Sequence, residues 1–200
     1  MKNIIFTLAF SGILISVSAQ NNSVVSTSGA SLNTLMPALD KSPMDMCYFP
    51  TDYPLLKTQN KTTTSPLVRV IYSRPQRDNR VIFGDLIEYN KVWRLGANEA
   101  TEIEFFKDVT IAGKKIPKGR YTLYAIPNPT KWTIIINKDM DTWGAFVYNE
   151  KKDLLRTDVP VQALAVPVEV FSMNFIKADK GASLYIAWEN VSVSLPIDIK

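Results

Sequence analysis

From residue 65 onward, apolar and polar positions alternate along the chain with a period of two. The segment 67–72 (LVRVIY) is rich in β-branched and aromatic residues, and the segment 131–137 (KWTIIIN) places its tryptophan and two of its isoleucines on one face. Because successive side chains of a strand point to opposite faces of a sheet, this alternation is typical of half-buried strands. About eight or nine such segments follow one another, separated by turn signals such as Asn128-Pro129.

The same region has no sustained helical periodicity, and only the segment 85–93 could form a single helical turn. The sequence therefore predicts an all-β fold: a single antiparallel β-sandwich, jelly-roll-like, of about eight or nine strands, with no long helix in the domain. Pro196 falls inside the last of these segments. It indicates an edge strand, where a missing backbone N–H costs least.

The first 19 residues have the composition of a secretory signal peptide. Lys2 supplies a positive charge, the run 4–17 is mostly apolar, and Val17-Ser18-Ala19 offers small residues at a cleavage point. An apolar run of about 14 residues is short for a bilayer span. We therefore expect cleavage after Ala19 and export to the periplasm or the extracellular space, with no membrane span after cleavage.

The remainder of the chain divides by composition. Residues 20–41 are rich in Ser, Asn and Thr without a sustained period, which predicts a flexible leader. Residues 42–56 are dense in methionine, aromatic residues and proline, so this segment should pack against a domain. The expected organisation is therefore a signal peptide at 1–19, a leader at 20–41 and one β-sandwich domain at 42–200.

Two residue types narrow the chemistry. The chain has no histidine and a single cysteine, Cys47. It can form no intrachain disulfide, no Ser-His-Asp or Cys-His catalytic pair and no histidine-based zinc site. Cys47, between Met46 and Tyr48, has the surroundings of a small buried apolar residue. These exclusions favour a protein that is not an enzyme and that needs no cofactor.

Charge adds little to this picture. The formal net charge is +4, and the basic residues are scattered rather than gathered in a stripe with aromatic partners. We therefore expect no nucleic-acid partner. Asp139 and Asp141 lie in a segment that departs from the EF-hand loop at several positions, so no metal site is expected.

Three strand connections, at 72–80, 83–101 and 140–156, hold most of the unusual polar residues. Ligands of β-sandwich proteins bind mainly at the connections between strands, because the sheets hold these connections in place. Six residues are therefore candidates for binding a small-molecule or glycan ligand: Arg74, Trp93, Arg94, Asn98, Glu99 and Thr101. The arginines would hold anionic or hydroxyl groups, Trp93 would stack, and the last three would orient the ligand.

Structural roles compete with each of these assignments. Arg94 could pair with an internal carboxylate, and Glu99 is the first choice because residues 96–98 form a turn between the two. Trp93 could belong to the core, as we expect of Trp132 and Trp188. Two function classes also compete with ligand binding: an interaction module without a pocket, and a glycan hydrolase. The hydrolase would use a carboxylate pair from Asp85, Glu88, Glu99, Asp153 and Glu189.

Several motifs together resemble the domain of unknown function 2911 family, whose members are exported proteins found mainly in Bacteroidetes-type bacteria. The motifs are YSRP at 72–75, IFG at 82–84, VWRLGANEAT at 92–101, GKKIPKGRYTLYAIP at 113–127, WTIIINKD at 132–139, WGAFVY at 143–148, DLLR at 153–156 and AWENVSVSLPI at 187–197. The resemblance covers about residues 42–197. It implies one all-β domain behind a signal peptide, and it brings no established activity, cofactor or catalytic residue.

Overall fold

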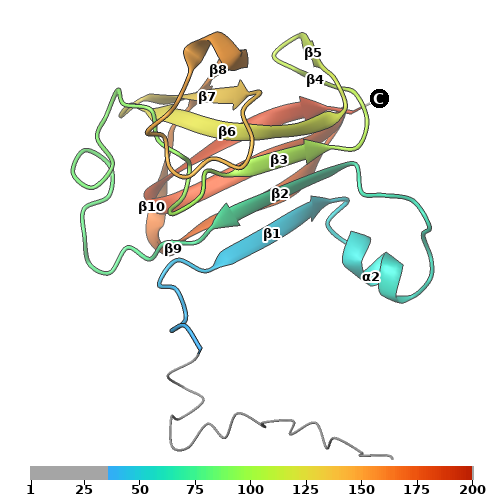
Figure 1. Cartoon of the computed structure of the whole chain (residues 1–200), viewed down its shortest axis with the longest axis horizontal. Helices are drawn as coiled ribbons and strands as arrows, with labels where there is room; N and C mark the ends of the chain where they lie inside the picture. Colours follow the sequence, from blue (N-terminus) through green and yellow to red (C-terminus); the bar gives the residue numbers. More distant parts are fainter. Residues whose placement is uncertain (1–35, 200) are drawn as a thin grey trace, which may run out of the picture. The chain divides into compact units, whose positions relative to one another are not determined.

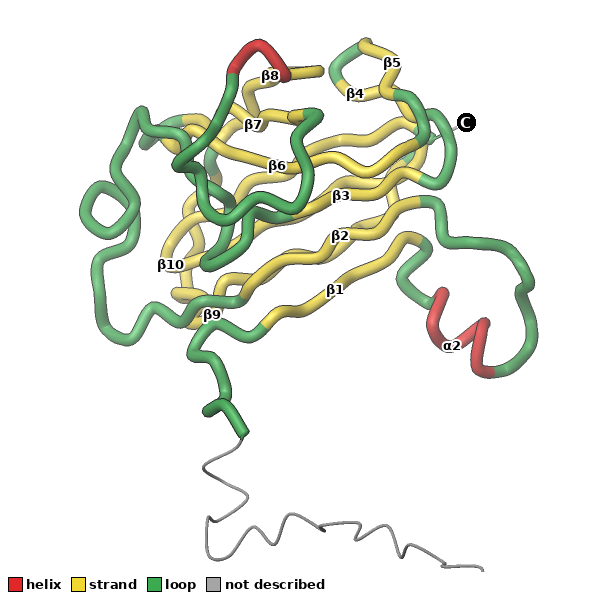
Figure 2. Tube along the Cα trace, in the orientation of Figure 1, coloured by secondary structure: helices red, strands yellow, loops and turns green. Residues whose placement is uncertain are grey.

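The computed structural model describes residues 36–199 (Figures 1 and 2). The expected signal peptide and most of the expected leader lie outside the described residues. The unit that carries all the strands begins at Leu39. None of its helices is long and apolar enough to cross a membrane.

Six antiparallel strands form the first sheet, in the order β1-β2-β3-β6-β7-β8. Their bounds are β1 Met44–Phe49, β2 Val68–Ser73, β3 Glu102–Phe105, β6 Gly119–Pro127, β7 Lys131–Asn137 and β8 Asp153–Pro160. The second sheet has the order β5-β4-β10-β9. Its strands are β5 Lys114–Ile116, β4 Val109–Ile111, β10 Gly181–Asp198 and β9 Gln162–Ala178. Two short helical segments, α2 (Tyr53–Thr58) and η1 (Glu150–Lys152), complete the described elements.

The core lies between the two sheets. Strand β2 buries Val68, Val70 and Tyr72, while the intervening residues face the other way. Strand β10 of the second sheet contributes residues such as Leu184 and Trp188 to the same core. The period-two pattern of the sequence is therefore the pattern of burial in the sandwich.

A second, smaller cluster covers the outer face of the first sheet. Tyr124 of β6 and Ile135 of β7 point away from the main core but are buried nonetheless. Ala100, Ala145 and Tyr148 pack over them. The connection that follows β7 thus folds back onto the sheet, and this placement brings it beside the segment 92–101.

The predicted all-β antiparallel sandwich is confirmed. Residues 36–199 contain ten strands: β1, β5 and β8 are not among the predicted segments, and the two predicted segments 183–188 and 191–197 form the single strand β10. The longest helix in the described residues, α2, has six residues. Trp132 and Trp188 lie in the core as expected, and Cys47 is half-buried against it. Burial raises the pKa of the Cys47 thiol to about 12.

The expectation that Pro196 marks an edge strand is wrong. Pro196 belongs to β10, which lies between β4 and β9. The pairs with β9 run as far as Ser192, and the pair with β4 joins Asp198 to Thr110. Pro196 lies between these two paired stretches, where a proline removes no ladder hydrogen bond.

Candidate functional site

The segment 92–101 forms a closed loop on the end of β6. It starts where Trp93 exchanges two backbone hydrogen bonds with Ala125, at N···O distances of 2.7 and 2.9 Å. It ends where the carbonyl of Thr101 accepts from Leu123 N–H at 2.8 Å. Between these points the Thr101 N–H donates to the Arg94 carbonyl at 3.1 Å. One strand therefore holds both ends of the loop.

The inner side of this loop belongs to the core. Leu95 is fully buried although its φ is 55°, a left-handed value that is unfavourable for a bulky side chain. Buried Thr101 donates its hydroxyl to the Leu95 carbonyl at 2.6 Å. A Cβ at Gly96 would lie 3.3 Å from the Ser73 carbonyl oxygen, a tight contact, so glycine suits the close approach of the loop to the end of β2.

Trp93 is part of an aromatic cluster in the core. Its ring stacks on Trp188 with centroids 6.1 Å apart and planes inclined by 19°, and it meets the edges of Phe83, Trp132 and Phe171. Its Nε1–H donates to the Gly96 carbonyl at 3.0 Å. With 6% of its surface exposed, Trp93 can offer a ligand only a small part of its ring.

The outer side of the loop supports the connection 140–148. Asn98, with a φ of 55°, presents its carbonyl to Gly144 N–H at 3.0 Å. Ala100 N–H donates to the Thr142 carbonyl at 2.9 Å, and Glu99 pairs with Trp143 as an isolated antiparallel bridge. The left-handed turn at Asn98 therefore sends the Glu99 side chain toward Trp143, where it is exposed.

Arg74 is held by three partners within the protein. Its Nη1 donates to Asp45 at 2.9 Å, its Nη2 to the Ser172 hydroxyl at 3.0 Å, and its Nε to the Phe171 carbonyl at 3.4 Å. The guanidinium thus links β1, the end of β2 and β9. These contacts correspond to the structural role of Arg74, in which the guanidinium connects parts of the protein to one another.

The expected ion pair between Arg94 and Glu99 is absent, so that expectation is wrong. The guanidinium of Arg94 makes no hydrogen bond or ion pair with any residue in 36–199, and its Nε is buried without a partner. Burial, with no opposing charge close by, lowers the pKa of Arg94. The physical reason is the turn at Asn98, which directs Glu99 to one side of the loop while Arg94 stays on the other.

Arg94 lies in the wall between two neighbouring hollows, which we call together the Arg94 cleft. Both hollows are lined by Leu86, Ile87, Trp93 and Arg94. The first, of about 390 Å³, is completed by Glu88, Lys91, Val92, Ala145 and Phe146. The second, of about 290 Å³, is completed by Ser42, Pro75, Arg80, Gly96, Ala97 and Trp188. The guanidinium of Arg80 donates to the carbonyls of Gln76 and Arg77. Lys91 and Arg94 have no acceptor among residues 36–199, and of these two Arg94 is the one with a buried donor, its Nε.

A different hollow of about 430 Å³, the Trp143 cleft, lies on the Glu99 side of the loop. It is lined by Met44, Ile71, Glu99, Ala100, Glu102, Asp141, Thr142 and Trp143. Glu102 is engaged by Arg120 at 3.4 Å and by the Asp141 N–H at 3.1 Å. Trp143 is 58% exposed, and Glu99 has no side-chain partner among residues 36–199.

The structure therefore separates the six candidate residues. Trp93 and Arg94 border the Arg94 cleft, and Glu99 borders the Trp143 cleft. Thr101 is buried inside the loop, Asn98 shapes its turn, and Arg74 is engaged elsewhere. Sequence reasoning missed Leu86 and Phe146, which are 46% and 80% exposed beside Arg94. Large apolar residues in a connection that also contains glycine, as in WGAFVY, were the available signal.

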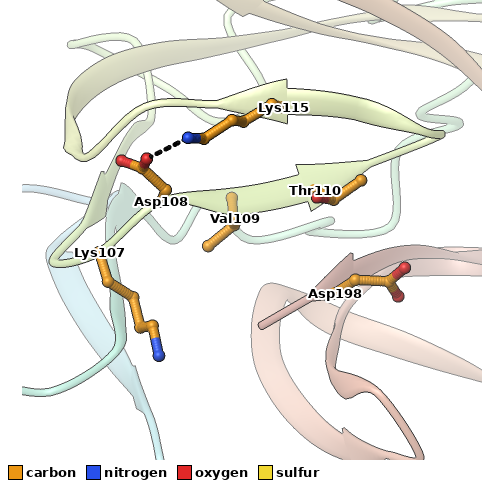
Figure 3. A pocket seen from close by; sticks show the side chains of 6 residues that line it. All are labelled: Lys107, Asp108, Val109, Thr110, Lys115 and Asp198. Carbon is orange, nitrogen blue, oxygen red and sulfur yellow. Dashed lines mark ion pairs between the residues drawn. The ribbon is translucent and has the colours of Figure 1, made fainter. Parts of the chain in front are cut away.

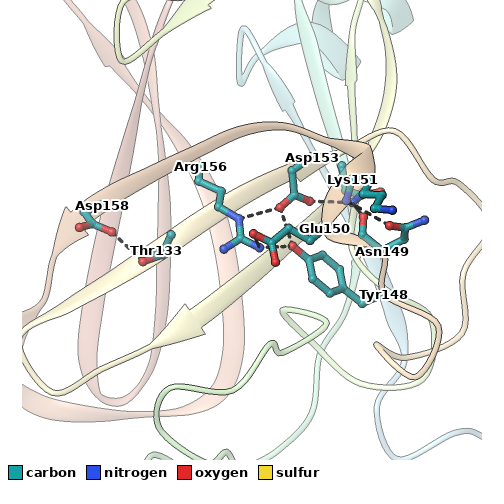
Figure 4. Close-up of polar contacts among 9 residues, drawn as sticks. Thr133, Tyr148, Asn149, Glu150, Lys151, Asp153, Arg156 and Asp158 are labelled. Atoms are coloured by element: carbon teal, nitrogen blue, oxygen red, sulfur yellow. Dashed lines mark hydrogen bonds and ion pairs between the residues drawn. The ribbon is translucent and has the colours of Figure 1, made fainter.

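The other carboxylates considered for hydrolysis are dispersed. Asp153 accepts from the Tyr148 hydroxyl at 2.5 Å and from Arg156 Nε at 2.6 Å, and these side chains converge in one network (Figure 4). Glu189, in the bulge of β10, accepts from the N–H groups of Ile82 and Phe83 at 3.3 and 3.4 Å. Both carboxylates therefore hold connections in place.

A further hollow, of about 390 Å³, opens beside β4 and the end of β10 (Figure 3). Lys107, Asp108, Lys115 and Asp198 surround it, and Lys115 pairs with Asp108 at 2.8 Å. Its charges are mixed and exposed, and it contains none of the six candidates. Within residues 36–199, no three acidic or cysteine side chains converge as a metal site would require.

Comparison with curated proteins and with solved structures gave no match. A family model described as "Protein of unknown function (DUF2911)" matches residues 55–197. The match covers the loop 92–101 and both clefts beside it, apart from Ser42 and Met44 on their rims. The chain therefore belongs to the family of proteins of unknown function 2911.

Proposed function

We propose that this protein is a non-enzymatic binding domain that holds a small ligand by an anionic or other hydrogen-bond-accepting group at Arg94. The observation that carries the proposal is the Arg94 guanidinium itself. It borders both hollows of the Arg94 cleft, its Nε is buried, and no residue in 36–199 accepts its hydrogen bonds.

The free energy of such a group favours a ligand. A buried donor without an acceptor carries an unrecovered cost of desolvation, and an ionised one carries more. A carboxylate, phosphate or sugar hydroxyl at Arg94 would supply the missing acceptor, and a planar guanidinium fork suits the first two. Arg69, Arg74, Arg120 and Arg156 have carboxylate partners within the protein, so Arg94 differs from them.

Binding fits the chemistry of this chain better than catalysis does. The sequence has no histidine, and the Cys47 thiol, with a pKa of about 12, is not a nucleophile at neutral pH. An exported location, expected from the first 19 residues, would place the ligand in the periplasm or outside the cell. A component of the cell envelope or a small nutrient would meet the domain there.

A fragment screen followed by ligand-observed NMR tests the proposal. Small anionic and neutral fragments are compared on the wild-type protein, on Arg94→Met and on the control Lys114→Met. The control removes one positive charge from an exposed position outside the cleft. We expect anionic hits on the wild type and the control that disappear in Arg94→Met. Hits that bind Arg94→Met equally well, or a screen in which no hit depends on Arg94, would contradict the proposal.

The Trp143 cleft favours a second candidate function, hydrolysis of a glycan. An exposed tryptophan could stack on a sugar ring beside three carboxylates, Glu99, Glu102 and Asp141. Glu99 is the one without a partner among the described residues, so it would be the reacting group. Release of reducing sugar from a glycan panel by the wild type, and its loss in Glu99→Gln, would support this candidate. No release from any glycan would reject it.

A further inference from the structure

The walls around Arg94 include apolar surface beside their charged groups. Leu86 and Phe146 stand exposed on the rim of the cleft, 46% and 80% accessible, and Ile87 and Trp93 line its floor. Isolated exposed apolar residues need no explanation on a protein surface. Here they surround a cation without an acceptor, so a ligand that fills the cleft would meet a charge and an apolar surface together.

The charge of the lining is biased in one direction. Arg80, Lys91 and Arg94 contribute three cations, and Glu88 is the one acidic residue that lines the two hollows. The carbonyl bonds of Arg80 use its donors but leave its positive charge in place. An anion would therefore be favoured over a cation or a neutral molecule by the field of the cleft as well as by the fork of Arg94.

From these two properties we infer that the ligand is a small amphipathic anion, a carboxylate or phosphate group attached to an apolar body. The head would bind Arg94, and the body would lie against Leu86 and Phe146. This inference rests on the proposed function and names the class of its ligand. Hollows of about 290 and 390 Å³ lie at the lower end of the sizes usual for ligand sites, so the ligand is small.

Tryptophan fluorescence can report binding, because Trp93 and Trp188 both line the cleft. Trp143 is exposed in the other cleft, so it is replaced by phenylalanine in every protein used. The probes are acetate, butanoate, hexanoate, octanoate, octyl phosphate and 1-octanol, with the octyl anions kept below their critical micelle concentrations and 1-octanol below its solubility limit. Comparison of octanoate with octyl phosphate then tells which of the two head groups the site prefers.

Affinity should rise about two- to fourfold for each methylene added from butanoate to octanoate, as expected for partial to full burial of each group. Octanoate or octyl phosphate should bind at least tenfold more tightly than 1-octanol. Arg94→Met should abolish this advantage, whereas Lys114→Met should keep it. Phe146→Ser, a change at a side chain that is 80% exposed and whose loss should leave the fold intact, should flatten the dependence on chain length.

Three results would overturn the inference, and they separate it from the proposed function. Equal affinity for acetate and octanoate would show that an apolar body adds nothing to binding, while the proposed binding of anions at Arg94 would stand. No response to any octyl probe, with Arg94-dependent anionic fragments still found, would do the same. Equal binding of octanoate and 1-octanol, unchanged in Arg94→Met, would reject both the inference and the proposed function.

Discussion

Replacement of Arg94 by methionine should leave the protein as stable as the wild type or slightly more stable. Methionine keeps the length and the apolar stem of the side chain, and it removes the buried Nε that has no acceptor in the described residues. A buried donor without a partner costs about 1–3 kcal/mol. Part of the guanidinium reaches the open cleft, so we expect the gain to lie between zero and about 1 kcal/mol.

Arg74→Met provides the matched comparison. It also removes a guanidinium, but one that contacts Asp45, Ser172 and the Phe171 carbonyl. Because this site is about one-third exposed, the loss of its contacts should cost about 1–2 kcal/mol. The two variants therefore differ in the sign of their effect although the substitution is the same.

Thermal unfolding followed by circular dichroism measures both effects. For a domain of this size 1 kcal/mol corresponds to about 2–4 °C in Tm. Arg94→Met should thus have a Tm between that of the wild type and about 4 °C higher, and Arg74→Met a lower one. A fall of more than about 4 °C for Arg94→Met would refute the reasoning, because it would show that the guanidinium has a stabilising partner in the folded protein.

Other substitutions and conditions test the loop and its surroundings. Thr101→Val should lower the free energy of unfolding by about 1–3 kcal/mol in urea titrations, since the buried Leu95 carbonyl loses its hydroxyl donor; a neutral effect would contradict this. Trp93→Ala should cost about 3–5 kcal/mol or prevent folding, and a smaller loss would show that the aromatic cluster can collapse. Burial raises the pKa of Tyr148 in the folded state to about 12 from an ordinary value of 10.0, so the stability that this group contributes is fully present below pH 10 and is lost as the pH rises through 12. In urea titrations from pH 9 to 12 that decline should be shallower in Tyr148→Phe, and an identical slope would count against it. Mass spectrometry of the mature protein should find Gln20 at its N-terminus. A product that retains Met1–Ala19 would contradict the expected cleavage.

Strands were predictable from the sequence where one face is buried and the other is not. Strand β2 alternates in burial along its length, as its residues alternate in polarity. Strand β1 was harder to identify because Met44 and Met46 are exposed, so its apolar residues do not all face the core. The segments 183–188 and 191–197 each alternate in polarity as a strand does, and Glu189-Asn190 between them has the composition of a turn, so the sequence predicts two strands here. They are one strand, β10, in which Glu189 adopts a φ of 53° at a bulge.

The partners of the arginines could not be predicted, because they depend on contacts distant in sequence. Arg74 meets Asp45, which lies 29 residues earlier, and Ser172, which lies 98 residues later. The pairing of Arg94 with Glu99 failed for a local reason. Asn98 builds a left-handed turn and the segment 98–100 pairs with 142–144, which sets the two charged side chains on opposite sides. Such tertiary pairing decides on which side of a loop a side chain lies. The pattern of polar and apolar residues in the sequence does not contain this information.

The place of β10 has a consequence for the order of folding. Of the described strands, β10 comes last along the chain, yet it is an interior strand of the second sheet and contributes Trp188 to the aromatic cluster around Trp93. Strands β4 and β9 both pair with it, so the second sheet has no centre until β10 has been synthesised. We expect nascent chains that stop before residue 181 to remain without a closed core. Residues 181–198 would therefore complete the second sheet in a late step that pairs β10 with a strand distant in sequence, β4, and such long-range pairing is intrinsically slow.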